Sequence, residues 1–208
     1  MSAVLTHTGF QPPKAKFALG VLALGLALAG VTVLGLIRRS SVPNETAPAA
    51  LVREAARTNL VLREGQLWSR EQEPFSGWMV EYFADGTARS RSAVANGLLH
   101  GLSRGYYTNA QLQVTEYFVA GVSEGVRTKW YPNGIRQSEA PIAGGKLQGT
   151  YRKWHENGVL AEEVEFAAGQ PEGVAWSYYP SGCRKGRVVL EQGRAVAQQF
   201  WRDGEEKP

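Results

Sequence analysis

The chain has 208 residues, of which 43% are hydrophobic and 20% charged, and its formal net charge is +4. Lys14, Lys16, Arg38 and Arg39 account for this excess, because the other basic residues equal the 19 acidic residues in number. The rest of the chain is therefore neutral, which excludes the basic surface that nucleic-acid binding needs.

The first predicted element is a membrane span. Residues 1–16 form a polar tail, and residues 17–37 are an uncharged apolar run, long enough to cross about 30 Å of hydrocarbon as a helix. A cleaved signal peptide is the alternative. However, its apolar region is usually about 7 to 15 residues long, and here Arg38 and Arg39 follow the run instead of a small-residue cleavage site. The sequence therefore predicts one transmembrane helix.

The flanks of this run bear on localisation. Basic residues lie on both sides of residues 17–37, so the charge rule hardly decides the orientation. A short tail, one span and a linker with Pro, Ala and Ser, residues 38–59, are typical of a bacterial signal-anchor. We expect a single-pass protein of the bacterial inner membrane, attached through residues 17–37, with its repeat domain in the periplasm or otherwise outside the cytoplasm.

Residues 60–196 contain an internal repeat of about 24 residues. The lead column is Gly77, Gly101, Gly125, Gly149 and Gly173; the central column is Gly86, Ala110, Gly134, Gly158 and Gly182; and the connector column is Gly97, Gly121, Gly145, Gly169 and Gly193. Pairs such as Asn133-Gly134 in the central column are type I′ turn signals. The sequence predicts an all-β repeat, an elongated antiparallel β-meander of about five hairpins that follows the transmembrane helix. Residues 197–208 are a C-terminal cap and tail.

Two aromatic rows run through these repeats. The first row is Tyr82, Tyr106, Trp130, Trp154 and Tyr178, and the second is Phe83, Tyr107, Tyr131, His155 and Tyr179. Adjacent strand residues face opposite ways, so each face of a largely single-layer sheet receives one row. The first row is the candidate interaction surface. The alternative is that both rows only support neighbouring strands.

The sequence offers no catalytic constellation. Histidine occurs at positions 7, 100 and 155, and Cys183 is the single cysteine. These residues compose no triad and no metal-ligand set, and His155 is expected to act as a packing ring in the second row. We predict no catalytic residues, no metal, no cofactor and no small-molecule substrate.

Several runs of residues carry a family resemblance. The clearest are Trp-Tyr-Pro-Asn-Gly at 130–134, Gly-Lys-Leu-Gln-Gly at 145–149 and Trp-His-Glu-Asn-Gly at 154–158. Over residues 60–193 the chain resembles the MORN-repeat variant found in many bacterial proteins. The resemblance implies a β-hairpin array that associates with proteins or membranes without catalysis and, for some bacterial members, an antitoxin role. The chain departs from the family pattern at Ala110, which occupies a glycine position, at Cys183 after the last central turn, and in its N-terminal span.

These observations predict a membrane-anchored, non-catalytic protein-interaction module, such as an accessory or stabilising subunit of a membrane complex. One alternative is an antitoxin or immunity-type inhibitor of an effector. Another is an envelope glycan-binding module that uses exposed aromatic rings.

Overall fold

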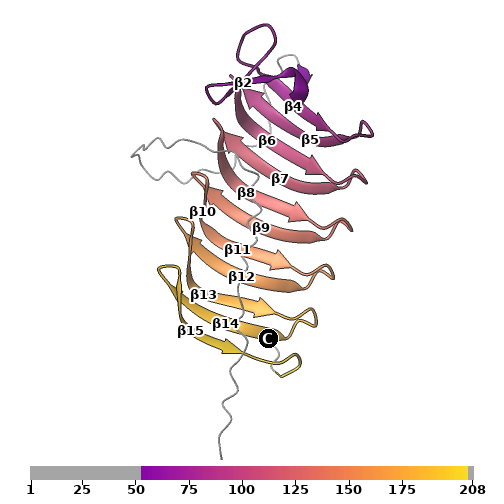
Figure 1. Cartoon of the computed structure of the whole chain (residues 1–208). Helices are drawn as coiled ribbons and strands as arrows, with labels where there is room; N and C mark the ends of the chain where they lie inside the picture. The colour runs from indigo at the N-terminus through magenta and orange to yellow at the C-terminus, as the bar shows by residue number, and fades with distance from the viewer. Residues whose placement is uncertain (1–52, 206–208) are drawn as a thin grey trace, which may run out of the picture. The chain divides into compact units, whose positions relative to one another are not determined.

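The computed structural model describes residues 53–205, which form one long sheet and a small hairpin beside it (Figure 1). The sheet has 13 strands, and from β4 onward they lie side by side in chain order, except that the short β10 pairs with β9, which also pairs with β11. Its strands are β1 (Glu54–Ala56), β4 (Gly77–Tyr82), β5 (Ala88–Ala95), β6 (Leu98–Tyr106), β7 (Leu112–Val119), β8 (Val122–Trp130), β9 (Arg136–Ala143), β10 (Lys146–Leu147), β11 (Gly149–Trp154), β12 (Leu160–Ala167), β13 (Gln170–Tyr178), β14 (Arg184–Glu191) and β15 (Arg194–Phe200). The predicted β-meander is therefore present.

The central turns differ from the prediction. Each closes a loop of three residues; in the third hairpin, the Tyr131 amide donates to the Ile135 carbonyl at 2.8 Å, and the Gly134 amide donates to the Tyr131 carbonyl at 2.9 Å. Gly134 has a φ of 82°, but Asn133 has a negative φ. This is the three-residue hairpin in which one left-handed residue forms a bulge. The type I′ prediction was wrong for these turns.

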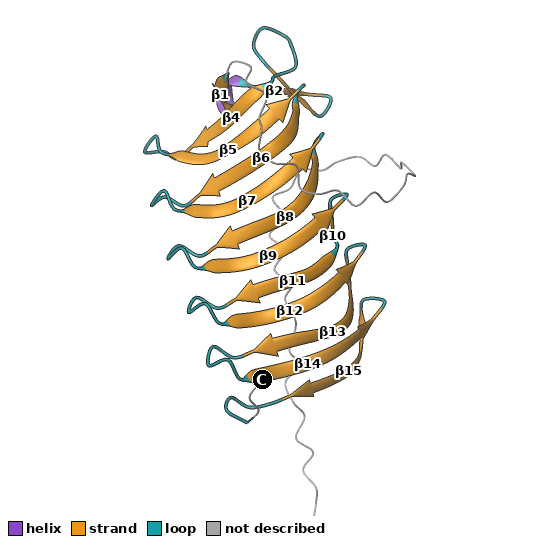
Figure 2. Cartoon of the chain, turned by 180° about the vertical axis from the view of Figure 1, so that it is seen from behind, coloured by secondary structure: helices purple, strands orange, loops and turns teal. Residues whose placement is uncertain are grey.

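The type I′ geometry occurs in the connectors instead. Ala120 and Gly121 both have positive φ, at 49° and 83°, as do Gly144 and Gly145, at 58° and 76°. Two successive left-handed residues give the backbone twist that joins two antiparallel strands through a two-residue loop. The connectors and the central turns line opposite margins of the sheet (Figure 2).

The lead glycines mark irregularities in strand pairing. Gly101 has a φ of 104°, and the pairing of β5 with β6 slips between Ser92 and Val94, opposite this part of β6. A β-bulge of this kind bends the strand that carries it. The strands accordingly curve along their length (Figure 1).

The two faces of the sheet differ in burial. We call one the Trp face, because it carries the first aromatic row, and the other the dry face. The dry face carries buried side chains from successive repeats, including Val94, Ile142 and Phe166, which are 5%, 7% and 4% exposed. Tyr151 packs edge-on against Phe166, with ring centroids 6.2 Å apart. The burial of Phe166 thus comes from a neighbouring strand of the same sheet.

A cap covers the dry face at the N-terminal end of the sheet. The hairpin of β2 (Val61–Arg63) and β3 (Gln66–Trp68) turns at Glu64 and Gly65. Leu60, Leu67 and Phe75 pack against Val94 to form a buried cluster. Phe75 is only 1% exposed. The sheet therefore has a hydrophobic lid over its first repeat, as repeat arrays require at their ends.

The predicted fold class needs two corrections. β1 lies within the predicted linker yet pairs with β4 in parallel, so the sheet is not wholly antiparallel. No helix in residues 53–205 is long and apolar enough to cross a membrane, and the helix in that range is the single turn η1 (Arg57–Asn59). The transmembrane helix expected at residues 17–37 lies outside the described residues. Within residues 53–205 the fold is thus an all-β, 13-stranded sheet with a small hairpin beside it.

Candidate protein-binding surface

The first aromatic row occupies equivalent positions in five consecutive hairpins. Each ring stands at the end of the first strand of its hairpin, opposite the first residue of the second strand, as in the pairs Tyr106 with Leu112 and Trp130 with Arg136. Because the register repeats, the five side chains project from the same face. Tyr82 is 49% exposed, and the other four are half-buried. The sheet therefore supports these rings from below and leaves part of each uncovered.

The structure adds a sixth member that the sequence analysis missed. The Trp201 carbonyl accepts a hydrogen bond from the Tyr179 hydroxyl at 2.9 Å, as the Trp154 carbonyl does from Tyr131 at 2.8 Å. Trp201 is therefore the equivalent of Trp154 in a sixth repeat. Its separation from Tyr179 is 22 residues, where the other pairs are 23 apart. This single-residue deletion took it out of the predicted column.

Guanidinium groups lie against several rings of the Trp face. The guanidinium carbon of Arg91 is 4.6 Å from the ring centroid of Trp78, and that of Arg136 is 5.4 Å from the centroid of Trp154. Such cation–π contacts are favourable even at exposed sites. They hold the rings in place and give this face a mixed aromatic and cationic character.

The C-terminal end of the Trp face holds the densest group of these side chains. The rings of Trp176 and Trp201 stack with centroids 6.5 Å apart and planes inclined by 14°. Arg184 and Arg187 lie over Trp176, at 4.9 Å and 5.8 Å from its centroid. Trp176 belonged to neither predicted row, and strand alternation, two positions before Tyr178, was the signal that places it on this face.

Exposed aliphatic side chains extend the Trp face in the middle of the array. Val119, Val122 and Val126 on β7 and β8 are 44%, 41% and 52% exposed, and Tyr117 is 36% exposed. Tyr117 pairs with Leu102, and Val119 pairs with Val122, so these side chains share the face of the aromatic row. Contiguous exposed apolar side chains of this kind mark interaction sites.

The second aromatic row has a structural role. The hydroxyls of Tyr107, Tyr131 and Tyr179 each donate to a main-chain carbonyl of the following repeat, at 2.8 to 2.9 Å. His155 occupies the same position, and its Nε2 lies 2.9 Å from the Tyr178 carbonyl. A carbonyl only accepts, so Nε2 carries the proton. His155 thus joins two repeats, which agrees with its predicted packing role.

Asparagines at the central turns join the repeats a second time. The Asn133 side-chain oxygen accepts from the Ile135 amide at 3.0 Å, while its amide nitrogen donates to the Glu156 carbonyl of the next turn at 3.2 Å. Asn109 and Asn157 repeat this arrangement. The side chains of these asparagines are engaged in hydrogen bonds within the fold, so they do not form a row that binds a partner.

Ion pairs cross the strands on both faces. Arg152 and Glu163 pair at 2.7 Å on the Trp face, and on the dry face the Glu116 carboxylate accepts from both Arg127 and Ser123. These groups are partly exposed, so each pair contributes little to stability. Their effect is to leave a surface of paired charges between the aromatic rings.

The environment of Tyr178 keeps its phenol protonated. Burial raises the pKa of Tyr178, and the negative charge of Glu163 raises it further, while Arg184 acts in the opposite direction. Tyr178 therefore loses its phenol proton at a higher pH than an unperturbed tyrosine does.

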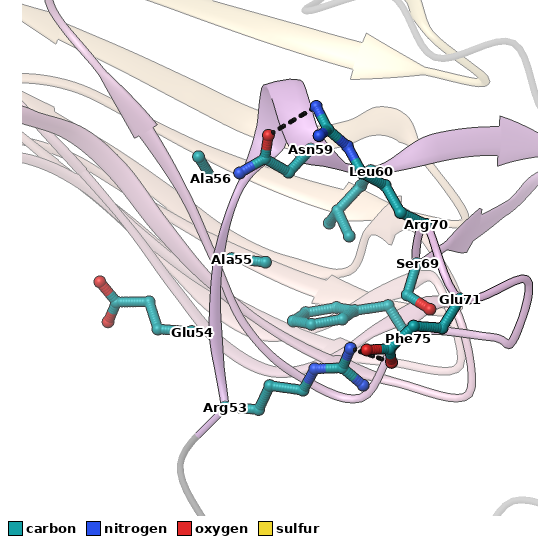
Figure 3. Close-up of a pocket in the computed structure, with 10 residues that line it drawn as sticks. All are labelled: Arg53, Glu54, Ala55, Ala56, Asn59, Leu60, Ser69, Arg70, Glu71 and Phe75. Atoms are coloured by element: carbon teal, nitrogen blue, oxygen red, sulfur yellow. Dashed lines mark hydrogen bonds and ion pairs between the residues drawn. The ribbon is translucent and has the colours of Figure 1, made fainter.

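A cavity of about 290 Å³ lies elsewhere, between β1 and the loop that follows β3. Figure 3 shows Arg53 directed at the Glu71 carboxylate, at 2.7 Å, and Arg70 hydrogen-bonded to Asn59 at 3.1 Å. Its lining includes none of the five predicted row residues. Within residues 53–205, no three His, Cys, Asp or Glu side chains stand close enough to hold a metal ion.

Residues 147–168, which include β11 and β12, match the family profile of the MORN repeat variant. No curated protein matches the chain. The MORN-repeat part of the resemblance is thereby confirmed for this hairpin, and MORN repeats are commonly protein- or membrane-binding modules without catalytic activity.

Proposed function

We propose that this chain is a non-catalytic protein-binding module and that a partner docks on the Trp face. The observation that carries the proposal is a continuous series of tryptophan, tyrosine and arginine side chains that no second layer covers in residues 53–205. Tryptophan, tyrosine and arginine are the residues enriched at the energetic centres of protein interfaces.

The rigidity of this surface supports the proposal. The second aromatic row and the turn asparagines tie each hairpin to the next, and arginines hold Trp78 and Trp154 in place. Rings that are fixed before binding lose little side-chain entropy when a partner docks. The array therefore presents a preformed surface.

The identity of the bound partner distinguishes an accessory subunit from an antitoxin or immunity-type inhibitor and from a glycan-binding module. Co-purification of the full chain in mild detergent should yield a stoichiometric protein complex. Recovery of one toxic effector, whose activity the chain suppresses, would instead make it an antitoxin or immunity-type inhibitor. Retention on isolated cell wall with no protein bound would contradict the proposal and indicate a glycan-binding module.

Attachment to a bacterial inner membrane through residues 17–37, with the repeats outside the cytoplasm, stays a prediction of the sequence. Its support is the apolar composition of that run and the basic residues that flank it. Membrane fractionation, with a compartment-specific reporter fused after Pro208, tests it. Recovery of the chain in the soluble fraction, or reporter activity restricted to the cytoplasm, would contradict it.

A further inference from the structure

The outermost strand of the sheet, β15, offers a second binding site of a different kind. It pairs with β14 on one side, and within the described residues no strand pairs with its other side. All seven of its residues are exposed. The outer edge of such a strand presents main-chain donors and acceptors that can pair with an added strand.

Comparison with the other repeats shows which kind of strand would pair with this edge. Phe200 pairs with Gly186 as Lys153 pairs with Ser138 in the preceding repeats, and Trp201 takes the place of Trp154. β15 is therefore the first strand of a hairpin. Each equivalent strand, β4, β6, β8, β11 and β13, is paired on its far side with a second strand. The edge of β15 repeats that geometry without a second strand in residues 53–205.

The two ends of the sheet differ in how they are protected. β1, at the other end, has three residues and runs directly into η1, and such a short edge offers little to pair with. β15 has seven residues, its single charge is Arg194, and it contains no proline. It thus lacks the devices by which edge strands commonly avoid pairing.

The ring of Phe200 provides an apolar contact beside this edge. A Cβ placed on Gly186 would stand 2.7 Å from Cδ1 of Phe200, so this glycine makes room for the ring on the dry face. The ring is 49% exposed. An incoming strand with an apolar side chain on that face would cover it.

Basic side chains outnumber acidic ones on the last two strands, which favours an acidic partner. β14 and β15 carry Arg184, Lys185, Arg187 and Arg194 against Glu191 alone. Inside the array, the acidic strand β12 already lies beside basic residues of β11, where Arg152 and Lys153 pair with Glu163 and Glu162. Complementary charge favours encounter with a partner of opposite sign.

We propose that the outer edge of β15 binds an extended, acidic segment of a partner polypeptide as an added antiparallel strand. This site is distinct from the Trp face. The segment resembles the second strands of the hairpins, with apolar and acidic residues interspersed. Main-chain hydrogen bonds hold it, and the basic end of the sheet favours its acidic side chains.

A synthetic peptide with the sequence of β12, LAEEVEFA, is the probe, and its binding to the full-length chain is measured by fluorescence anisotropy. We expect saturable binding that weakens as salt is raised. The peptide LAQQVQFA, in which glutamine replaces each glutamate, should bind several-fold more weakly. A peptide N-methylated at alternate residues, which cannot donate from one edge, should not bind. Equal binding of all three peptides would overturn the proposal.

A pair of protein variants tests whether the peptide binds at β15. The amides of Gln198 and Gln199 point to opposite edges of the strand, because successive amides alternate. Of the two substitutions Gln198→Pro and Gln199→Pro, one therefore removes a donor on the outer edge, and the other removes a hydrogen bond to β14. The variant that loses the outward donor should remain folded by circular dichroism and lose at least about tenfold in peptide affinity.

Three other results would overturn the proposal. One is unchanged peptide affinity in both folded proline variants. Another is loss of peptide binding in Tyr82→Ala, which would place the peptide on the Trp face. The third is a dimer of the full chain that the outward proline dissociates, because a second copy would then occupy the edge. Co-purification of a partner through the Trp face is independent of these outcomes, so the two proposals can fail separately.

Discussion

Individual residues hold the array together mainly through side-chain to main-chain hydrogen bonds between consecutive repeats. Tyr131 reaches the Trp154 carbonyl, and Asn133 reaches the Glu156 carbonyl. The sequence placed Tyr131 and His155 in the same aromatic row correctly, because the 24-residue period alone determines which residues are equivalent. It did not show that the row bonds to the next repeat, because that contact depends on the distance between hairpins.

Tyr131→Phe tests this linkage. The substitution removes the hydroxyl that donates to the Trp154 carbonyl at 2.8 Å, so the free energy of unfolding should fall by about 1 kcal/mol. Tyr117→Phe is the matched control, because the Tyr117 hydroxyl makes no hydrogen bond within residues 53–205 and its ring is exposed. Urea denaturation measures both; equal stability of the two variants would contradict the assigned role.

Two reciprocal substitutions in the connector turns should change the stability of the protein in opposite directions. Ala120 and Gly144 occupy the same turn position with φ of 49° and 58°, a conformation that glycine adopts without steric cost. Gly144→Ala should destabilise the protein and Ala120→Gly should stabilise it, each by up to about 1 kcal/mol. Thermal denaturation measures the two shifts. Shifts of the same sign would contradict the assigned turn geometry.

Alkaline pH should destabilise the fold through its buried phenols. Burial raises the pKa of Tyr151 above its usual value of 10.0, and Glu162 raises it further. The unfolded chain therefore loses this proton at lower pH than the folded chain, so the stabilising contribution is complete below pH 10 and declines as pH rises through the folded pKa. Denaturation between pH 8 and pH 11 should show a smaller loss for Tyr151→Phe than for the natural chain; identical losses would contradict this.

At the scale of elements, the hairpin is the repeating unit, and its turns show where reasoning from sequence stops. The glycine columns identified every turn of the five hairpins, because glycine is favoured where φ is positive. They did not distinguish the three-residue loop at Asn133 from the two-residue loop at Ala120. An Asn-Gly pair is favoured in type I′ turns, but Asn133 here bonds to the adjacent turn, a contact between repeats that local preference does not contain.

Removal of one whole repeat should leave a folded array. Deletion of residues 125–148 joins Glu124 to Gly149, which restores the sequence of columns, and each hairpin contacts mainly its neighbours. The shortened chain should unfold cooperatively with a smaller dependence on denaturant, since less surface is exposed. Deletion of residues 125–147 is the control. It shifts the register by one residue and should destabilise the protein far more.

At the scale of the sheet, one face carries the packing that stabilises the array, and the other carries the exposed side chains that could bind a partner. The dry face carries the buried rows and the N-terminal cap, while the Trp face leaves aromatic, aliphatic and cationic side chains in contact with solvent. The sequence identified five members of the displayed row. It missed Trp201 because of a one-residue deletion, and it missed the valines of β7 and β8 because exposure depends on what covers a face. The open edge of β15 was equally hidden from composition.

Site-specific photo-crosslinking in the full chain tests whether a partner binds the Trp face. A photoreactive amino acid is placed at Tyr82 or Val126, which are 49% and 52% exposed on the Trp face, and at Lys153, whose side chain is 42% exposed on the dry face. We predict that one partner protein is crosslinked from Tyr82 and Val126 and not from Lys153. Crosslinking from Lys153 alone would contradict the assignment of the Trp face as the binding surface.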